Sequence, residues 1–121
     1  MNGSCLCGEI RFEVFNPPTV GTACHCEQCR KLSGHYWASA KVDDGDLTIQ
    51  GAPRWYRSSD KAARGFCGTC GAFLFWKHDD EAQTSFSLGV LETPTGVKIA
   101  KHIFTAFKGD YYDLHDDLPK S

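Results

Sequence analysis

Residues 66–71 read FCGTCG, and the expected fold depends on this stretch. Two cysteines three positions apart can bind one metal ion when the chain between them turns tightly. Gly68 and Gly71 supply the conformational freedom that such a turn needs. The alternative is a pair of inert, buried thiols on a β-turn. Because a second close pair of cysteines occurs elsewhere in the chain, we expect a metal-binding knuckle here.

The chain of 121 residues contains seven cysteines in three groups. They are Cys5 and Cys7, then Cys24, Cys26 and Cys29, then Cys67 and Cys70. Seven thiols cannot all pair into internal disulfides. Neighbours two or three positions apart are poor partners for a relaxed disulfide, but they suit a tetrahedral zinc ion with Zn–S bonds of ~2.3 Å. We therefore expect metal sites.

The N-terminal segment MNGSCLCGEIRF has neither the basic nor the apolar region of a secretory signal. We therefore expect a cytoplasmic, reducing location, in which thiols stay free unless a metal ion holds them.

A knuckle supplies only two ligands, so a second pair must complete its site. Cys5 and Cys7 would point to the same face if this segment is extended. Two cysteines of the middle group are the alternative partners. We favour a site formed by Cys5, Cys7, Cys67 and Cys70, because this division keeps the other three cysteines together in one short loop. Such a closed, all-thiolate site contributes directly to folding free energy.

The middle group lies in the sequence CHCEQC, residues 24–29. Cys24 and Cys26 can share one face, and a single helical turn would bring Cys29 beside them. Three thiolates leave the fourth position of a tetrahedral ion open, which is typical of a catalytic zinc site. A second structural site closed by a histidine is the alternative. Arg30 and Lys31 follow directly, and their positive charge should favour thiolates over thiols.

The five histidines are weaker candidates, because a single histidine is more often structural than chemical. His25 should point away from the face of its neighbouring cysteines, either packed or exposed. His35 and His102 could each fill the fourth position or donate a proton. His78 and His115 lie among acidic turn residues and are expected to face solvent.

Composition and charge limit the function classes. Hydrophobic residues make up 41% and charged residues 23%, which is typical of a globular protein. A formal net charge of −2 argues against binding nucleic acid by phosphate neutralisation and against a polybasic membrane surface. No run approaches the ~18–20 apolar residues of a membrane span. We find no linker or repeat and expect one domain over residues 1–121.

Hydrophobic periodicity favours an all-β or nearly all-β fold. Residues 9–15 alternate, with Ile10, Phe12 and Val14 on one face. Asp43 to Asp46 form a strong turn signal. Further strands are expected at residues 19–24, 36–42, 47–50, 55–58, 63–66, 72–76, 84–91 and 97–107. Helix is expected only at residues 27–33 and, as an alternative, at 59–64. The acidic tail over residues 111–119 should be irregular, anchored by Tyr112 and Leu114.

Four blocks together resemble the glutathione-dependent formaldehyde-activating enzyme family, which shares its domain with centromere protein V-like proteins. They are GSCLCGEIRFEV, CHCEQCRKLSG, FCGTCGAFLF, and KHIF followed by DDLP, and they extend from Gly3 to Pro119. The resemblance implies a β-tent-like fold of stacked, mainly antiparallel sheets pinned by zinc. It also implies a structural zinc at Cys5, Cys7, Cys67 and Cys70, and a more labile catalytic zinc at Cys24, Cys26 and Cys29.

The family's named reaction joins formaldehyde and glutathione as S-hydroxymethylglutathione. We therefore predict a zinc-dependent carbon–sulfur lyase-type enzyme acting on a small thiol adduct. The alternatives are a non-catalytic zinc-stabilised binding module and a thiol redox protein that uses the CxCxxC loop. A tripeptide with two carboxylates needs basic partners, and the candidates are Arg30, Lys31, Arg54, Arg57 and Arg64. Some of Tyr36, Trp37 and Trp55 are candidates to line a pocket.

Overall fold

The computed structural model describes residues 1–121 as ten strands, one α-helix and three short 3₁₀ turns. The strands are β1 (Asn2–Ser4), β2 (Arg11–Val14), β3 (Val20–Cys24), β4 (Trp37–Asp43), β5 (Leu47–Gln50), β6 (Arg54–Arg57), β7 (Ala62–Phe66), β8 (Phe73–His78), β9 (Gln83–Ser87) and β10 (Lys98–Ile103). The helix is α1 (Glu27–Ser33), and the 3₁₀ turns are η1 (Asp44–Asp46), η2 (Leu88–Val90) and η3 (Thr105–Phe107). The prediction of a nearly all-β fold is confirmed. No helix is long and apolar enough to cross a membrane.

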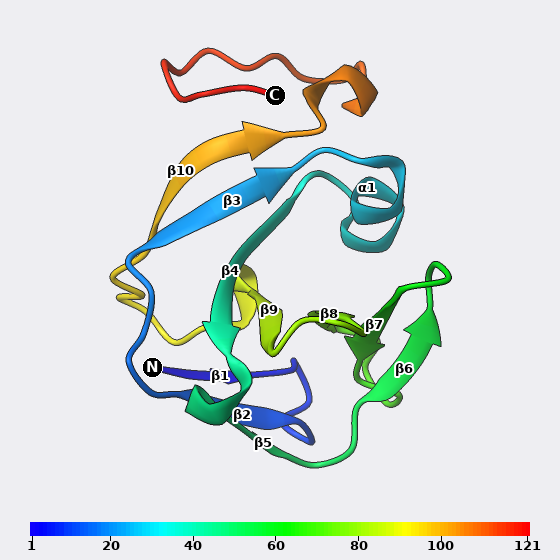
Figure 1. The fold of residues 1–121 in the computed structure, drawn as a ribbon, viewed down its shortest axis with the longest axis vertical. Coiled ribbons are helices and arrows are strands. Elements are labelled where there is room, and N and C mark those ends of the chain that lie inside the picture. The colour runs from blue at the N-terminus through cyan, green and yellow to red at the C-terminus, as the bar shows by residue number, and fades with distance from the viewer.

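The strands form two sheets, and their order in the larger sheet does not follow the chain (Figure 1). The smaller sheet has the order β1-β2-β5, and the larger has the order β10-β3-β4-β9-β8-β7-β6. Every pair is antiparallel except β10 and β3. This parallel pair brings the end of β10 beside the first cysteine of the middle group, because Ile103 lies opposite Cys24.

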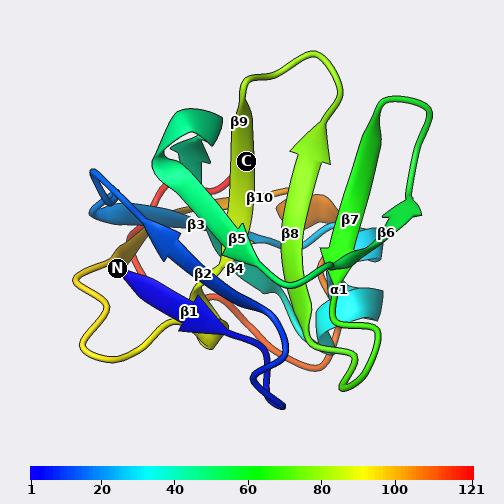
Figure 2. The ribbon, with the colours of Figure 1, turned by 90° about the horizontal axis from the view of Figure 1, so that it is seen from below.

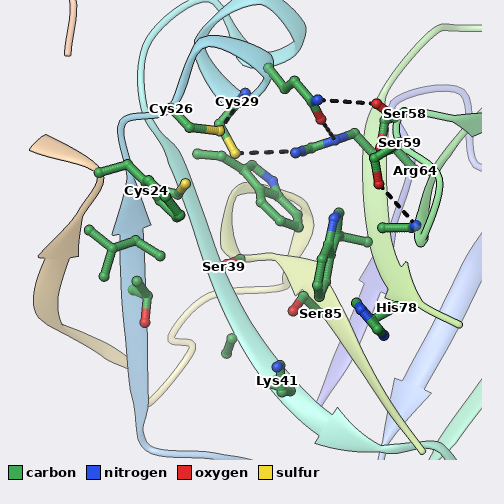
Figure 3. Close-up of a pocket in the computed structure, with 18 of the residues that line it drawn as sticks. Cys24, Cys26, Cys29, Ser39, Lys41, Ser58, Ser59, Arg64, His78 and Ser85 are labelled. Carbon is green, nitrogen blue, oxygen red and sulfur yellow. Dashed lines mark hydrogen bonds between the residues drawn. The ribbon is translucent and has the colours of Figure 1, made fainter. Parts of the chain in front are cut away.

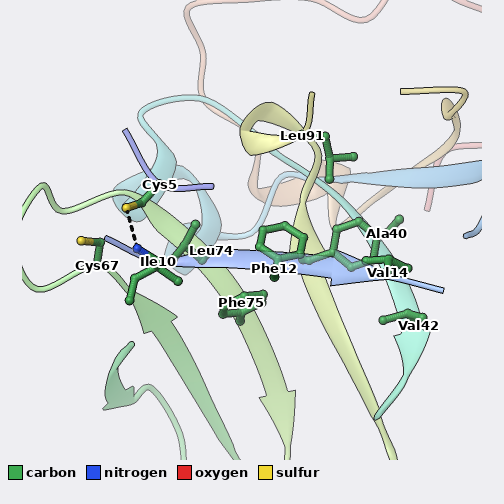
Figure 4. Close-up of a cluster of buried hydrophobic side chains, with 11 residues drawn as sticks. Cys5, Ile10, Phe12, Val14, Ala40, Val42, Cys67, Leu74, Phe75 and Leu91 are labelled. Atoms are coloured by element: carbon green, nitrogen blue, oxygen red, sulfur yellow. Dashed lines mark hydrogen bonds between the residues drawn. The ribbon is translucent and has the colours of Figure 1, made fainter. Parts of the chain in front are cut away.

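The core lies between the small sheet and one face of the large sheet (Figures 2 and 4). Phe12 of β2 packs against Phe75 and Phe86, with ring centroids 5.2 and 5.8 Å apart. Ile10, Phe12 and Val14 are each at most 3% exposed, which confirms the predicted alternation. Cys5 and Cys67 belong to this same cluster, so the four-cysteine site lies at an end of the core.

The opposite face of the large sheet carries the residues that alternate with the core residues. In β4, Ala40 and Val42 lie in the core cluster, whereas Ser39 and Lys41 line a pocket on the other side. This follows from the strand period of two, which sends successive side chains to opposite faces. One strand thus supplies both the core and the pocket wall.

The structure differs from the sequence prediction mainly at element ends. The alternative helix at residues 59–64 is wrong, because β7 begins at Ala62 and pairs with β6 and β8. The predicted strand at 84–91 ends at Ser87 and continues as η2. The predicted strand at 97–107 ends at Ile103, because Phe104 has a left-handed backbone (φ 54°) that no strand accommodates.

Candidate functional site

Four sulfur atoms from distant parts of the chain meet at one end of the core. The Sγ atoms of Cys5, Cys7, Cys67 and Cys70 all lie within 4.8 Å of one another. Cys5 and Cys7 are 3.6 Å apart at sulfur, and Cys7 and Cys67 are 3.8 Å apart. A tetrahedral zinc ion with ~2.3 Å bonds requires sulfur atoms about 3.8 Å apart. The donor set and its spacing therefore fit zinc.

Two tight turns build this cluster. Cys70 donates its N–H to the sulfur of Cys67 (3.5 Å), and Gly71, with φ 79°, donates its N–H to the carbonyl of Cys67 (2.8 Å). Gly68 has no positive φ; its missing Cβ instead admits the Arg54 side chain, which would lie 2.6 Å from a Cβ there. The segment of Cys5 and Cys7 turns rather than extends, and the N–H of Ile10 donates to the Cys5 sulfur.

The N–H groups directed at these sulfurs favour negative charge. The N–H groups of Cys7 and Ala72 lower the pKa of Cys70 to about 6. The N–H of Glu9 also favours the Cys7 thiolate, yet burial and the hydrogen bonds with the other cysteines raise the pKa of Cys7 to about 12. Thiolates this close repel one another, so full ionisation of the cluster requires a cation among them.

The second cluster contains Cys24, Cys26 and Cys29, whose sulfurs also lie within 4.8 Å of one another. Cys24 ends β3, Cys26 is the N-cap of α1, and Cys29 lies in the first turn of that helix. The N–H of Cys29 donates to the Cys26 sulfur at 3.4 Å, as in the other CxxC turn. The sulfurs thus fall into the two predicted groups of four and three, and both groups could hold metal ions such as zinc.

The contact between Cys24 and Cys29 shifts the pKa values of the two thiols in opposite directions. A hydrogen bond with Cys29 lowers the pKa of Cys24, and the same contact is the main reason that the pKa of Cys29 is raised. Both thiols are buried. Two buried thiolates in contact repel strongly, so only a cation would let all three sulfurs of the cluster ionise together. The chemistry of these donors therefore also fits a divalent metal.

A pocket of about 650 Å³ adjoins the three-cysteine cluster (Figure 3). Its walls come from α1 and from strands β3, β4, β7, β8, β9 and β10. The cysteines lie at one end, and Lys41 and His78 lie at the other. Nineteen residues line it, and none is Asp or Glu. None of the four cysteines of the first cluster lines it, whereas all three cysteines of the second cluster do.

Arg30 and Lys31 were expected to place positive charge beside the thiolates, but neither contacts a sulfur atom. Lys31 pairs with Glu27 at 2.9 Å on the surface, and the Nε of Arg30 donates to the carbonyl of Phe107. Arg64 of β7 instead donates from Nη1 to the Cys29 sulfur at 3.5 Å. The other predicted basic partners face elsewhere: Arg57 pairs with Asp79, and Arg54 packs over Gly68.

Polar pocket residues that the sequence analysis did not single out come from several elements. They are Thr22, Gln28, Ser39, Lys41, Ser58, Ser59, Ser85 and Lys101. Lys41 could have been found from the sequence, because it shares a strand face with Trp37, a candidate pocket residue that does line the cavity. Tyr36 lines only a second cavity, of about 420 Å³, and Trp55 lines neither. His78 was expected to face solvent but lines the pocket.

A buried hydrogen-bonded chain runs behind the cluster. His25 is fully buried and hydrogen-bonds to the Tyr112 hydroxyl through Nδ1 and to His102 through Nε2 (2.8 Å). His102 Nε2 lies 2.9 Å from Asp116. His102 and Lys120 lower the pKa of Asp116 to about 2, so this carboxylate accepts from His102 Nε2–H. When both imidazoles are neutral, His102 Nδ1 then accepts from His25, and His25 Nδ1 accepts from Tyr112.

This hydrogen-bonded chain corrects the expectation for His102 and confirms those for His25 and Tyr112. His102 uses both ring nitrogens within the chain, so neither is directed at the cysteine cluster. His35 is exposed and lines neither of the two cavities described above. His25 is packed, and Tyr112 anchors the irregular tail through it, as predicted.

Substitution His102→Ala is expected to destabilise the protein by about 3 kcal/mol, lowering Tm by roughly 10 °C. The change leaves a cavity and removes the acceptor of the buried His25 Nε2–H. Thermal unfolding of the zinc-loaded protein measures it. His115→Ala removes an exposed imidazole and should change Tm by no more than a degree or two. Equal Tm values for the two variants would show that the buried chain contributes nothing.

The match to known proteins places this arrangement in a family. Residues 1–107 match the family model described as glutathione-dependent formaldehyde-activating enzyme. The chain belongs to this family. The resemblance noted from the four sequence blocks is thus confirmed.

Two curated relatives and one solved structure match shorter stretches of this member of the glutathione-dependent formaldehyde-activating enzyme family. A Halomonas elongata protein, whose name assigns it provisionally to this enzyme family, is 33% identical over 89 residues, 65% of this chain. An uncharacterized lyase of Schizosaccharomyces pombe is 30% identical over 77 residues, 63% of this chain. The matched stretch spans 56% of the length of each relative. A Rhodobacter sphaeroides crystal structure is 28% identical with a TM-score of 0.62, covering 77% of this chain and 89% of that one.

Proposed function

We propose that this chain is a zinc-dependent carbon–sulfur lyase-type enzyme acting on a small thiol adduct, with S-hydroxymethylglutathione as the leading candidate. One observation carries the proposal: all three cysteines of the second cluster line a ligand-sized cavity, and none of the four cysteines of the first cluster lines that cavity. A closed four-thiolate site is structural, and a three-ligand site beside a cavity is typical of catalysis. The family match and the relative named as a lyase support the same class of reaction.

The assignment of residues follows from the two clusters. Cys5, Cys7, Cys67 and Cys70 would hold a structural zinc ion, and Cys24, Cys26 and Cys29 would hold the catalytic one. At the second site, a bound zinc ion would supply a position for a substrate thiolate or a Lewis acid for a carbonyl oxygen. The residues of the chain hold the sulfurs in place, and the pocket walls shield one side of the centre from bulk water.

The pocket also suits an anionic thiol adduct. Its volume of about 650 Å³ lies within the range of about 300–1,000 Å³ that small-molecule sites occupy. Arg64 and Lys101 line it, as does Lys41, which pairs with Glu81 at 3.0 Å. No lining residue is Asp or Glu, which favours a ligand that carries carboxylates, as glutathione does. Ser58 Oγ, the only buried side-chain oxygen or nitrogen lacking a hydrogen-bond partner, also belongs to this wall.

The test combines metal analysis with an activity assay on anaerobically purified protein. We expect two zinc ions per chain, one removed readily by a chelator, and a matching loss of S-hydroxymethylglutathione cleavage into glutathione and formaldehyde. Nuclear magnetic resonance of the adduct follows that reaction directly. Two equally tight zinc ions with no turnover would favour a non-catalytic binding module. One tight zinc and a reversibly oxidised pair among the middle cysteines would favour a redox protein.

Two further assignments belong to this proposal. We treat residues 1–121 as one catalytic domain, since both cysteine clusters draw on strands of the same fold. A cytoplasmic location remains a prediction, which fractionation of cells expressing the tagged protein would check.

A further inference from the structure

Arg64 is a buried cation without a carboxylate partner. Its side chain projects from β7 into the pocket wall, and the residue is 6% exposed. None of the ion pairs in the structure includes it. Arg57 on the neighbouring strand β6, by contrast, is exposed and forms two hydrogen bonds with Asp79. A buried charge is costly unless negative charge or hydrogen bonds compensate it, so the surroundings of Arg64 must supply that compensation.

The contacts of Arg64 direct it at the three-cysteine cluster (Figure 3). Its Nη1 donates to the Cys29 sulfur at 3.5 Å, and its Nε donates to Oε1 of Gln28 at 3.2 Å. Gln28 is in turn held by the carbonyl of Ser58, which accepts from Nε2 at 3.1 Å. The guanidinium carbon lies 5.6 Å from the centre of the Phe73 ring. These contacts fix the charge against a sulfur instead of leaving it mobile in the pocket.

The net charge of the metal centre explains what the fixed Arg64 guanidinium can do. Three thiolates with one divalent ion carry a net charge of −1. A thiolate bound at the fourth position would make the net charge −2. The pocket wall around this centre contains no acidic residue. A neutral ligand would leave the net charge unchanged. A guanidinium held 3.5 Å from one of these sulfurs therefore stabilises the centre with an anionic ligand more than the centre with a neutral ligand.

We propose that Arg64 is a positioning residue that holds Cys29 and acts as a fixed counter-charge, so that the three-cysteine centre selects anionic over neutral ligands. The inference rests on the proposed metal site at these cysteines, but it is independent of the reaction performed there. It also separates Arg64 from Lys41 and Lys101, which line the pocket without a contact to sulfur. Lys41 pairs with Glu81 at 3.0 Å, whereas no ion pair includes Lys101.

The test measures ligand affinity on cobalt-loaded protein, in which visible absorption reports the coordination of the metal. Mercaptoethanol, which binds metals as a thiolate, is titrated at constant pH, and imidazole serves as the neutral ligand. Arg64→Gln should weaken mercaptoethanol binding by about tenfold or more while changing imidazole binding less than about twofold. Arg64→Lys keeps the charge and should restore most of the mercaptoethanol affinity.

Arg30→Gln is the matched control, because it removes a positive charge one residue from Cys29. The Nε of Arg30 donates to a backbone carbonyl and not to sulfur. The ligand affinities of this variant should equal those of the wild type. Arg64→Met gives a second uncharged variant should the glutamine variant fail to fold. Wild-type protein that binds only one cobalt ion would overturn the metal centre and this inference together. Two cobalt ions with unchanged mercaptoethanol binding in the uncharged variants would overturn this inference alone.

Discussion

Cys67→Ser is expected to leave the protein largely unfolded. Cys67 is fully buried, belongs to the core cluster, and lies 3.8 Å from the Cys7 sulfur. Structural zinc sites contribute about 10–16 kcal/mol to folding in small zinc domains, whereas a domain of this size has a net stability of about 5–15 kcal/mol. Loss of one of the four zinc ligands would remove a large part of the free energy that zinc binding contributes to folding. The remaining interactions would then not suffice to keep the chain folded.

Far-UV circular dichroism and zinc content after gel filtration measure this outcome. Leu6→Ala is the control, because Leu6 lies between two cysteines of the same cluster and is 91% exposed. It should leave both the spectrum and the zinc content unchanged. A Cys67→Ser protein that is monomeric, folded and close to the wild type in Tm would show that this cluster is not a structural metal site.

Cys26→Ser should abolish the proposed lyase activity and leave the fold intact. Cys26 is the only half-buried cysteine of the middle group, and its sulfur caps α1 by accepting the N–H of Cys29. Serine is a strong N-cap residue, so the helix keeps its cap in the variant. Serine is nevertheless a poor zinc ligand, so the site loses one of its three donors. We expect activity to fall at least about 100-fold and one of two zinc ions to be lost.

The comparison of the two serine variants tests the division of roles directly. Circular dichroism should show a folded Cys26→Ser protein with one tightly held zinc ion, beside an unfolded Cys67→Ser protein. Adduct cleavage in the Cys26→Ser protein at the wild-type rate would remove these cysteines from the catalytic site. Collapse of both variants alike would mean that the second cluster is structural as well.

Short-range patterns predicted much of the fold. The alternation through Phe12 and Val14 identified β2 and its buried face, and the acidic turn after β4 was recognised from its composition. The signal fails where a strand is short or its end is decided by packing. Strand β1 has three residues and no alternation, and it exists because it pairs with β2. The end of β10 depends on the backbone of Phe104, which the apolar pattern does not reveal.

By itself, the sequence determined which neighbouring cysteines lie close together, because residues two or three positions apart are held close by the local backbone whatever the rest of the chain does. The tertiary structure decided that Cys5 and Cys7 meet Cys67 and Cys70. Only the tertiary structure decided which charges surround those sulfurs. Arg64 reaches Cys29 from a strand 35 positions away in the sequence, and His102 reaches His25 across 77 positions. Such contacts depend on the order of strands in the sheet, and that order arises from the packing of the whole domain, beyond the reach of any local pattern.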